Sequence, residues 1–328
     1  MKFKKLNLGF TVEDSLPVVT IIVPTRPGQL EILSVTASRA LNYPSDKLEI
    51  IVARGRQPAV QRNVAINAAR GELIYFLDDD CIPSPGNLRR AVGYFQQSDV
   101  KMVSGPSLCP PDAPLLEQVF KVVHTSWLAF GPSRVRYAPV GEVRESDEKE
   151  LIGCNLLARR DILLELGGFH EALYPNEDHP LYIELKRRGA KMIYDPAFSV
   201  QRRPRPTLKA FLKMLVNYGR GRAEEFRLHP TFGAAPNFIP PLFCLYLVVA
   251  PWFGWRALAP LVLYALAVLG QTVVSAFTQG IFKSLLAMPL IVITHLFYGL
   301  GFWRGLFTRL RGKASKPPTE VVLERFAV

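Results

Sequence analysis

Apolar runs and helical spacing alternate through the first hundred residues. Four runs are apolar over almost their whole length: Val18–Val23, Leu48–Val52, Glu72–Leu77 and Val100–Ser104. Helical spacing separates the first three, over residues 29–41 and 57–70. Strands without polar alternation are typical of parallel sheets that are buried on both faces. The pattern therefore predicts an α/β fold, with a mostly parallel sheet between two layers of helices.

The same alternation continues, less regularly, to residue 205. The further elements that we expect are a helix over 115–130, a strand over Ile152–Ala158 and helices over 160–166 and 181–188. Gly167-Gly168 and Gly189 follow the last two helices, as glycines commonly do at helix ends. The polar segment 134–150 is predicted to be a loop. Residues 1–205 therefore read as one domain.

An amphipathic helix is predicted directly after this domain. Its apolar stripe follows the spacing i, i+3, i+4, i+7, i+8 and comprises Leu208, Phe211, Leu212, Leu215 and Val216. Lys209 and Lys213 lie off the stripe. A helix with an apolar stripe and a basic face suits a membrane interface, and an ordinary helix packed on the domain is the alternative. We expect residues 206–237 to form a basic juxtamembrane segment.

The last third of the chain is far more apolar than the rest. Between Phe238 and Trp303 the only formal charges are Arg256 and Lys283, which is not the pattern of a soluble domain. Three apolar segments follow one another: Phe238–Phe253, Ala257–Phe277 and Leu285–Trp303. The second and third can cross ~30 Å of hydrocarbon, whereas the first is short and contains two prolines. We expect residues 238–305 to form two full crossings and one partial segment.

The tail that follows, residues 306–328, is basic. Together with Arg304 it holds Arg309, Arg311, Lys313, Lys316 and Arg325. Three crossings would place this tail outside, while the positive-inside bias places it in the cytosol, so either one segment is re-entrant or interfacial or the bias fails. Residues 1–14 lack an apolar core of signal-peptide length. We therefore expect a multi-pass protein of the cell inner membrane with a cytosolic N-terminal domain.

Charge is concentrated beside the apolar third. The chain carries 40 Lys+Arg against 28 Asp+Glu, a net charge of +12. Half of this excess lies in residues 202–227, where eight basic residues stand against two acidic ones. Such a cluster suits anionic lipid head groups, and because no nucleic-acid motif accompanies it we expect no nucleic-acid partner. The four cysteines are far apart and show neither disulfide nor zinc spacing.

The sharpest candidate for chemistry is Asp78-Asp79-Asp80, which follows the strand Glu72–Leu77. Ligands of such sheets bind beyond the carboxyl ends of the strands. Side chains alternate along extended chain, so Asp78 and Asp80 can face one side together. Two carboxylates there suit Mg²⁺ or Mn²⁺, which also bind phosphate oxygens. A solvated acidic turn is the alternative.

A second acidic motif, Asn176-Glu177-Asp178-His179-Pro180, opens the helix 181–188. Asp178 could act as a general base that removes a proton from an acceptor hydroxyl. It could equally cap the helix, since Pro180 is tolerated in a first turn. His179 is either a metal ligand or a structural histidine. Capping and catalysis both remain open for Asp178 at this point.

Arginines form a third group of candidates. Arg202 and Arg203 carry guanidinium forks that match diphosphate oxygens, with attraction to a membrane surface as the alternative. Arg62 could reach a nucleotide from the sheet edge or lie exposed on its helix. Residues 218–222 (YGRGR) follow a helix and so are not a dinucleotide fingerprint; they either hold a lipid phosphate or flank the membrane.

Taken in order, these motifs resemble the family 2 glycosyltransferases with the GT-A fold. The matching stretches are VTIIVPT (19–25), QRNVAINAARGELIYFLDDD (61–80), GCNLLARRDILLELGGF (153–169), NED (176–178) and YDPAFSV (194–200). The resemblance covers about residues 18–225, and residues 206–226 are similar to the succinoglycan-type exopolysaccharide subgroup. It implies a GT-A fold, with a Rossmann-like, mostly parallel sheet in residues 1–205.

The resemblance also implies roles for individual residues. Asp78 and Asp80 match the family's metal- and diphosphate-binding Asp-X-Asp, and Asp178 matches its catalytic base. The residues that it places around the nucleotide sugar are Pro24, Thr25, Arg62, Asp78, Asp79 and Asn155, to which the arginine pattern adds Arg202 and Arg203.

Two departures from the family pattern qualify the resemblance. The family commonly has an aspartate after its second strand that contacts the nucleotide base, but residues 52–56 read VARGR, so Arg54 would make different contacts. The Gln-X-X-Arg-Trp signature of processive synthases is also missing, because residues 201–205 read QRRPR. This second departure weighs against processive polymerisation.

The activity implied by the resemblance is inverting transfer of a sugar from a nucleotide-diphosphate donor to a hydroxyl. The acceptor would be lipid-linked or a polysaccharide, at the cytosolic face of the membrane, and the reaction would depend on Mg²⁺ or Mn²⁺. Two rival functions stay open. One is transfer to polyprenyl phosphate itself, and the other is a non-catalytic membrane scaffold of a polysaccharide synthase complex.

Overall fold

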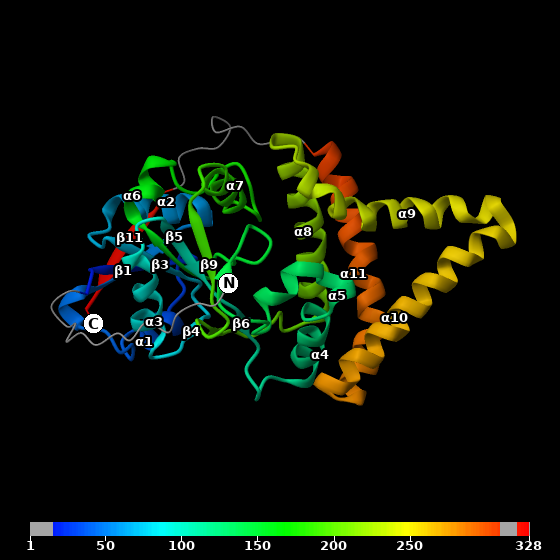
Figure 1. Ribbon diagram of the computed structural model, residues 1–328, viewed down its shortest axis with the longest axis horizontal. Coiled ribbons are helices and arrows are strands. Elements are labelled where there is room, and N and C mark those ends of the chain that lie inside the picture. The colour runs from blue at the N-terminus through cyan, green and yellow to red at the C-terminus, as the bar shows by residue number, and fades with distance from the viewer. Residues whose placement is uncertain (1–15, 309–319, 328) are drawn as a thin grey trace.

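The computed structural model describes residues 16–308 and 320–327 of the chain (Figure 1). Its centre is a mixed sheet of eight strands in the order β11-β2-β1-β3-β8-β5-β9-β7. The strands are β1 (Val19–Thr25), β2 (Leu48–Arg54), β3 (Leu73–Leu77), β5 (Val100–Ser104), β7 (Arg144–Glu145), β8 (Asn155–Arg159), β9 (Lys191–Tyr194) and β11 (Val322–Phe326). A second sheet pairs β4 (Ile82–Pro83), β10 (Val200–Gln201) and β6 (Ser107–Leu108).

The first three strands are parallel, as the apolar runs predict. From β1 the chain passes through α1 to β2 on one side and then through α2 to β3 on the other. The sheet order therefore reverses between β1 and β3, which is where ligands bind in such folds. Beyond β3 the sheet is mixed, because β8 runs antiparallel to both β3 and β5.

Helices cover both faces of this sheet. They are α1 (Leu33–Ser38), α2 (Pro58–Ala68), α3 (Asn87–Val92), α6 (Arg160–Glu165) and α7 (His179–Arg187), with 3₁₀ turns η1 (Ser45–Lys47) and η2 (Gly93–Gln96). Alternate residues of β1 enter the two cores: Ile21 and Val23 lie in one, and Ile22 in the other. The helix expected over residues 29–41 is shorter than the pattern predicted.

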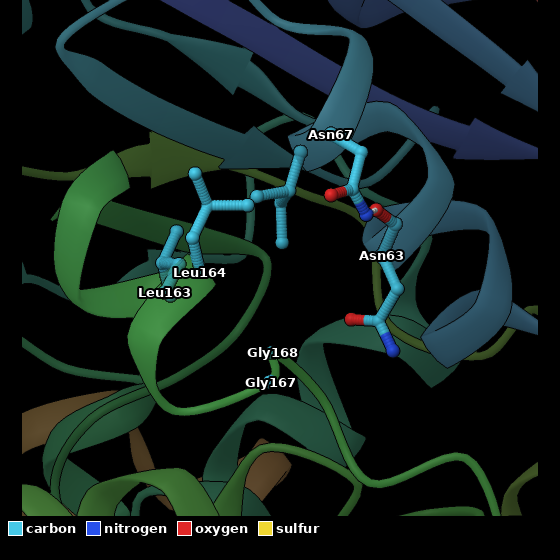
Figure 2. A pocket seen from close by; sticks show the side chains of 7 residues that line it. Asn63, Asn67, Leu163, Leu164, Gly167 and Gly168 are labelled. Carbon is cyan, nitrogen blue, oxygen red and sulfur yellow. Dashed lines mark hydrogen bonds between the residues drawn. The ribbon is translucent and has the colours of Figure 1, made fainter.

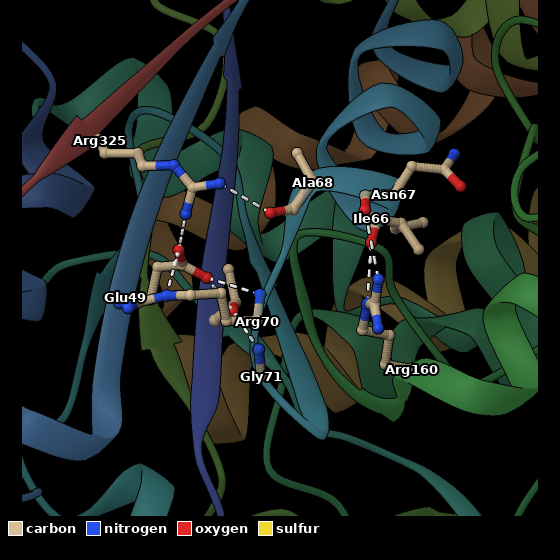
Figure 3. A network of polar contacts seen from close by, with 9 residues as sticks. Glu49, Ile66, Asn67, Ala68, Arg70, Gly71, Arg160 and Arg325 are labelled. Atoms are coloured by element: carbon tan, nitrogen blue, oxygen red, sulfur yellow. Dashed lines mark hydrogen bonds and ion pairs between the residues drawn. The ribbon is translucent and has the colours of Figure 1, made fainter.

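The C-terminal tail contributes a strand to the main sheet. β11 pairs antiparallel with β2, from Val322 opposite Arg54 to Phe326 opposite Ile50. Figure 3 shows how it is anchored: Arg325 pairs with the buried Glu49 of β2 and donates to the Ala68 carbonyl at 2.8 Å. The sequence predicted only a basic tail here, and four of its basic residues, Arg309, Arg311, Lys313 and Lys316, lie outside the described residues.

Beside the sheet stands a layer of helices. It comprises α4 (Leu115–His124), α5 (Trp127–Phe130), η3 (Gly131–Arg136), α8 (Leu208–Leu228) and α11 (Ile281–Phe307). The predicted helix over 115–130 is broken at Ser126, whose side chain caps α5 by accepting from the Ala129 amide at 3.2 Å. Phe211 of α8 stacks on Phe120 of α4, with ring centroids 4.2 Å apart. Phe211, Leu212 and Leu215 of the apolar stripe thus pack against protein, whereas Leu208 is exposed.

Glycines let α8 and α11 approach closely. A Cβ on Gly301 would lie 2.2 Å from the Val216 carbonyl oxygen, and one on Gly219 would lie 2.0 Å from that of Tyr298. Small residues at such crossings allow helix backbones to touch. Figure 1 shows the two helices side by side along their length.

Two further helices extend away from this layer. η4 (Phe232–Phe238) leads into α9 (Ile239–Val249), and η5 (Ala250–Ala257) turns the chain into α10 (Leu258–Gln279), which returns to the start of α11 (Figure 1). The turn contains Gly254 at φ +56°, a backbone conformation that favours glycine. Large apolar side chains are exposed along this hairpin, including Leu242, Trp252, Trp255, Leu263 and Phe277. By length and composition, residues 233–279 and 281–307 could each cross a membrane.

The close contact between α8 and α11 gives a test with a matched control. Gly301→Ala would force Val216 away, and we expect it to lower the free energy of unfolding by about 1–3 kcal/mol. Gly270→Ala changes a glycine of α10 that has open space around it, so it should be neutral or stabilising by up to about 1 kcal/mol. Thermal unfolding of the two purified variants compares them, and equal stability would contradict this account of the helix contact.

Candidate functional site

Three aspartates lie where the strand order reverses. Asp78, Asp79 and Asp80 follow β3, next to the carboxyl end of β1. Thr25, the last residue of β1, donates its hydroxyl to Asp79 Oδ2 at 2.9 Å. Pro24 is buried in β1 and pairs with Ala53 of β2. The crevice expected at a topological switch point is therefore lined by acidic groups that are tied to the sheet.

Arg202 bridges two of these carboxylates. Its Nη1 lies 3.0 Å from Asp78 Oδ2, and its Nε lies 2.7 Å from Asp80 Oδ1. Burial would raise the pKa of Asp78, but Arg202 and Arg62 outweigh burial and hold that pKa below its ordinary value. Burial is also the main reason why the pKa of Asp79 is raised. Asp78 is therefore a carboxylate at neutral pH, with a guanidinium on either side.

Arg62 joins the two acidic motifs. Its Nη2 lies 3.0 Å from Asp78 Oδ1 and its Nη1 lies 2.8 Å from Glu177 Oε1, while its side chain is only 7% exposed. The guanidinium also lies over the ring of Phe169, 5.2 Å from the ring centroid. Burial raises the pKa of Glu177, and Arg62 opposes that rise. Two segments that are a hundred residues apart in the chain thus share one buried cation.

Asn63, the neighbour of Arg62 on α2, holds the loop that leads to Glu177. Its side-chain amide donates to the Phe169 carbonyl at 2.9 Å, and its Oδ1 accepts from the Phe169 amide at 2.8 Å. A Cβ on Gly168, whose φ is +72°, would lie 2.3 Å from that Oδ1. Figure 2 shows Asn63 beside Gly167 and Gly168 at a cavity of about 100 Å³. This space is too small for a nucleotide sugar. It lies where Asn63 holds the loop, so we assign it no ligand.

Asp178 begins α7 but does not cap it. It stands at the N-cap position without a side-chain capping hydrogen bond. Its Oδ2 accepts instead from the Tyr182 hydroxyl at 3.1 Å. A Cβ on Gly153 would lie 3.1 Å from the same oxygen, so only glycine leaves that side of the carboxylate open. The capping alternative thus finds no support in the contacts of Asp178.

His179 belongs to a polar contact between α7 and α8. Its ring is 2% exposed, with Nδ1 2.8 Å from Arg222 Nη1 and Nε2 3.3 Å from Arg136 Nη2. Burial, reinforced by Arg222, lowers the pKa of His179, against the opposing effect of Glu225. Both ring nitrogens lie near arginines, and Nδ1 also lies 3.3 Å from Glu225 Oε1, so the metal-ligand alternative finds no support in these contacts.

A cavity of about 730 Å³ joins these groups to the helical layer. Its lining includes the charged groups Arg62, Asp78, Asp178 and Arg202. It also includes apolar and aromatic residues: Trp127, Phe130, Met214, Ile239 and Pro240. The volume suits a ligand of nucleotide or glycolipid size. One space therefore connects the aspartates with the root of α9.

Two carboxylates are available for a divalent cation. No group of three or more His, Cys, Asp or Glu is arranged for a metal within residues 16–308 and 320–327. Mg²⁺ is usually held by one or two carboxylates and completes its shell with phosphate oxygens and water. Asp78 and Asp80 fit that requirement, and the Arg202 guanidinium now lies between them.

The remaining predicted residues have different surroundings. Asn155 is fully buried, accepts from the Tyr75 hydroxyl at 2.8 Å and donates to the Phe198 carbonyl at 2.6 Å, so the structure does not bring it to the cavity. Arg203 lines the cavity but pairs with Glu117 at 2.6 Å. Arg54 is the last residue of β2, at the carboxyl end of the strand, and does not line the cavity.

Sequence reasoning missed the pairing partners of the site. The motif that contains Glu177 does not predict its contact with Arg62, which spans 115 positions of the chain. Arg136 falls in the segment predicted to be a loop, which contains the end of η3 and all of β7. The charge of each of these residues is visible in the sequence. No local spacing, however, identifies the distant residue with which it pairs.

Comparison with known proteins places the geometry in context. Residues 10–216 match a family described as "Glycosyltransferase like family 2". The succinoglycan biosynthesis protein ExoA of Rhizobium meliloti (strain 1021) is 31% identical over 189 residues, which cover 55% of this chain and 54% of that protein. The pre-mycofactocin glycosyltransferase of Mycobacterium tuberculosis is 28% identical over 175 residues, 53% of this chain and 36% of that protein. The matches span about half or less of these relatives.

A solved structure shows the same fold. The mannosyltransferase PcManGT from Pyrobaculum calidifontis, in complex with GDP-Man and Mn²⁺, aligns with a TM-score of 0.51 at 19% identity. The alignment covers 89% of this chain and 87% of that one. The predicted GT-A fold is thereby confirmed.

The buried guanidinium of Arg62 gives a direct test of how the site is held together. Arg62→Met leaves Asp78 and Glu177 without their shared partner, and breaking a buried pair in this way costs about 3–5 kcal/mol. Arg187→Met removes an arginine whose side chain is 72% exposed, and we expect a change within about 1 kcal/mol. Equal melting temperatures for the two purified variants would refute the structural role of Arg62.

Proposed function

Because the chain belongs to the glycosyltransferase-like family 2, we propose that it moves a sugar from a nucleotide-diphosphate donor to a hydroxyl of an acceptor held in the large cavity. The observation that carries this proposal is the convergence of Asp78 and Asp178 on one space. Asp80 joins them through Arg202. A donor bound at the aspartates would present its sugar to Asp178.

The diphosphate is assigned to Asp78, Asp80 and Arg202. The two carboxylates would hold Mg²⁺ or Mn²⁺, which when bound offsets the negative charge of the leaving diphosphate. Arg202 occupies the space between the carboxylates. With a metal held by the two carboxylates, the planar fork of Arg202 would be free to bind the diphosphate oxygens. Arg62 stays in place, since Glu177 holds its other side.

Asp178 is assigned the role of general base. Its carboxylate lines the cavity, and Gly153 leaves one side of it open. The Tyr182 hydroxyl orients it from the helix side. A carboxylate so placed can accept the proton of the acceptor hydroxyl while that oxygen attacks the sugar. A single displacement of this kind inverts the anomeric centre.

The acceptor that fits the cavity best is lipid-linked. The cavity lining combines charged groups, Asp178 among them, with aromatic and apolar residues that include Ile239 and Pro240 at the root of α9. An amphiphile can place its glycan at Asp178 and its chain along those apolar residues. A polysaccharide acceptor would leave the apolar residues unused. Transfer to polyprenyl phosphate remains the rival, because a phosphate oxygen needs no strong base.

Two carboxylate variants test the proposal. We expect Asp178→Asn to reduce transfer by at least about 100-fold, the contribution typical of a general base, and Asp80→Asn to do the same through loss of the diphosphate site. Asp112→Asn, at an exposed position, is the matched control and should keep full activity. Transfer is measured with purified protein, a nucleotide sugar, Mn²⁺ and a membrane lipid extract as acceptor.

Each assigned role can fail separately in that assay. Normal turnover by Asp178→Asn with an inactive Asp80→Asn would favour the polyprenyl-phosphate rival. A product with the donor's anomeric configuration would contradict a single displacement. If the unaltered protein neither transferred nor hydrolysed any nucleotide sugar tested, the catalytic proposal would fail. The non-catalytic scaffold would then be the favoured function.

We further propose that the hairpin of α9, η5 and α10 is the part that enters the membrane. Between Ile239 and Gly280 its one formal charge is Arg256, which lies at the turn beside Trp252 and Trp255. Both tryptophans are more than three-quarters exposed. Tryptophan and arginine are typical of the region where hydrocarbon meets head groups. α10 has 22 residues, about 33 Å at the helical rise, enough to cross the hydrocarbon.

The contacts of α11 support this choice over a crossing by α11 itself. Near its start, Lys283 donates to Gln118 of α4 at 3.2 Å. At its end, Arg227 of α8 donates to the Thr308 carbonyl at 2.5 Å. Both ends thus lie beside helices of the catalytic domain, and α8 carries charges that hydrocarbon would not accommodate. This pairing of crossings differs from the sequence expectation, in which the second and third apolar segments cross.

Cysteine accessibility distinguishes the two arrangements. In a cysteine-free background, we expect Trp255→Cys to react with a membrane-impermeant maleimide from the side opposite the catalytic domain. Ile281→Cys, at the turn between α10 and α11, should react only from the catalytic side. Sealed vesicles of known orientation provide both measurements. The reverse result would establish crossings by α10 and α11, and no reaction of Trp255→Cys from the opposite side would mean that the hairpin does not cross.

A further inference from the structure

The sugar and the nucleoside of a bound donor lie on opposite sides of its diphosphate. If the diphosphate lies at Asp78 and Asp80 and the sugar faces Asp178, the nucleoside extends in the other direction, over the carboxyl ends of β1 and β2. Neither Thr25 nor Arg54, the last residues of those strands, lines the cavity. The two residues are register partners in the sheet. The edge formed by β1 and β2 is therefore where the nucleoside must rest.

Arg54 is the charged group at that edge whose position the protein fixes. Its side chain is 19% exposed, and its Nη1 donates to the Gln29 carbonyl in the loop after β1 at 2.7 Å. Its Nε lies 2.7 Å from Glu324 Oε1. Arg26 and Arg56, which flank the same edge, are exposed. Glu324 comes from β11, so the C-terminal strand sets the direction of this guanidinium.

β11 is built into the sheet over its whole length. Five of its residues pair with β2, and Leu323 and Phe326 pack against the two cores on opposite faces. Arg325 pairs with the buried Glu49 (Figure 3). Its neighbour Glu324 lies on the other face, because side chains alternate along a strand. Arg39 of the turn after α1 donates to the Ala327 carbonyl at 3.2 Å. The position of Glu324 is thus determined by contacts that do not involve Arg54.

We propose that the C-terminal strand completes the donor site, with Arg54 contacting the nucleoside and Glu324 acting as the residue that positions Arg54. The ligand class is a nucleoside diphosphate, whose base and ribose offer oxygens to the guanidinium. The inference rests on the proposed function, because it takes the diphosphate to lie at Asp78 and Asp80. The charge-assisted hydrogen bond to Glu324 fixes the orientation of the Arg54 guanidinium, which would otherwise be freer to rotate in solvent.

The test measures the dissociation constants of UDP and GDP for the full chain by calorimetry, in the presence of Mn²⁺. Glu324→Gln should weaken the preferred nucleotide roughly tenfold, the effect of losing one charge-assisted hydrogen bond, and should change the UDP:GDP ratio. At saturating donor the turnover number should stay near that of the unaltered protein, because Asp178 and its surroundings are untouched. Arg54→Gln should have the same effect, and the double variant should be no weaker than either single one.

Two variants separate positioning from support of the fold. Leu323→Ala weakens the packing of β11 on the other face without touching the Arg54 pair, so the UDP:GDP ratio should be unchanged. Glu320→Gln alters an exposed residue ahead of the strand and should change neither constant. Unchanged constants in Glu324→Gln and Arg54→Gln, or the same change in Leu323→Ala, would overturn the inference. If the unaltered protein bound neither nucleotide and turned over no nucleotide sugar, the proposed function itself would fall instead.

Discussion

One buried guanidinium, that of Arg62, holds the candidate site together. It lies between Asp78, which follows β3, and Glu177, which precedes α7. A charge removed from water is tolerable only with partners of opposite sign, so the two acidic loops are drawn to the same point. Asn63 reinforces this arrangement one residue further along α2, by holding the loop that leads to Glu177. Two neighbouring residues of α2, Arg62 and Asn63, thus hold together the loops that carry Asp78 and Asp178.

The helical layer connects this chemistry to the apolar third of the chain. Arg136, His179 and Arg222 link η3, α7 and α8 in a row of polar contacts. On its other side α8 touches α11 through glycines, and α11 carries the hairpin. The contacts near the aspartates are polar hydrogen bonds, whereas those between α8 and α11 are close approaches of the two helix backbones. The candidate site and the apolar surface are therefore parts of one continuous structure.

The sequence predicted those elements whose signal is local. Val100–Ser104 is a strand with the predicted bounds, and the runs before it differ by one or two residues at their ends. β11 could not be predicted in this way, because it lies at an antiparallel edge and its partner β2 is about 270 residues earlier. The packing of α11 was missed for another reason: an apolar side chain has the same character against lipid as against α4. Gly301 and Gly305 were the available signal of a close helix contact. Asn155 shows that the position of a motif residue can be set by buried hydrogen bonds of the sheet, which no local spacing reveals.

The place of β11 in the chain has a consequence for biosynthesis. Its partner β2 is made early, whereas β11 follows the hairpin and α11. While a ribosome is still synthesising those helices, β2 has an unpaired outer edge, and such edges invite association with other chains. The sheet of the nascent domain therefore stays incomplete until β11 itself has left the exit tunnel, after the hairpin and α11. Completion of the sheet thus follows synthesis of the hairpin, and a polypeptide stalled before that point would lack its last strand.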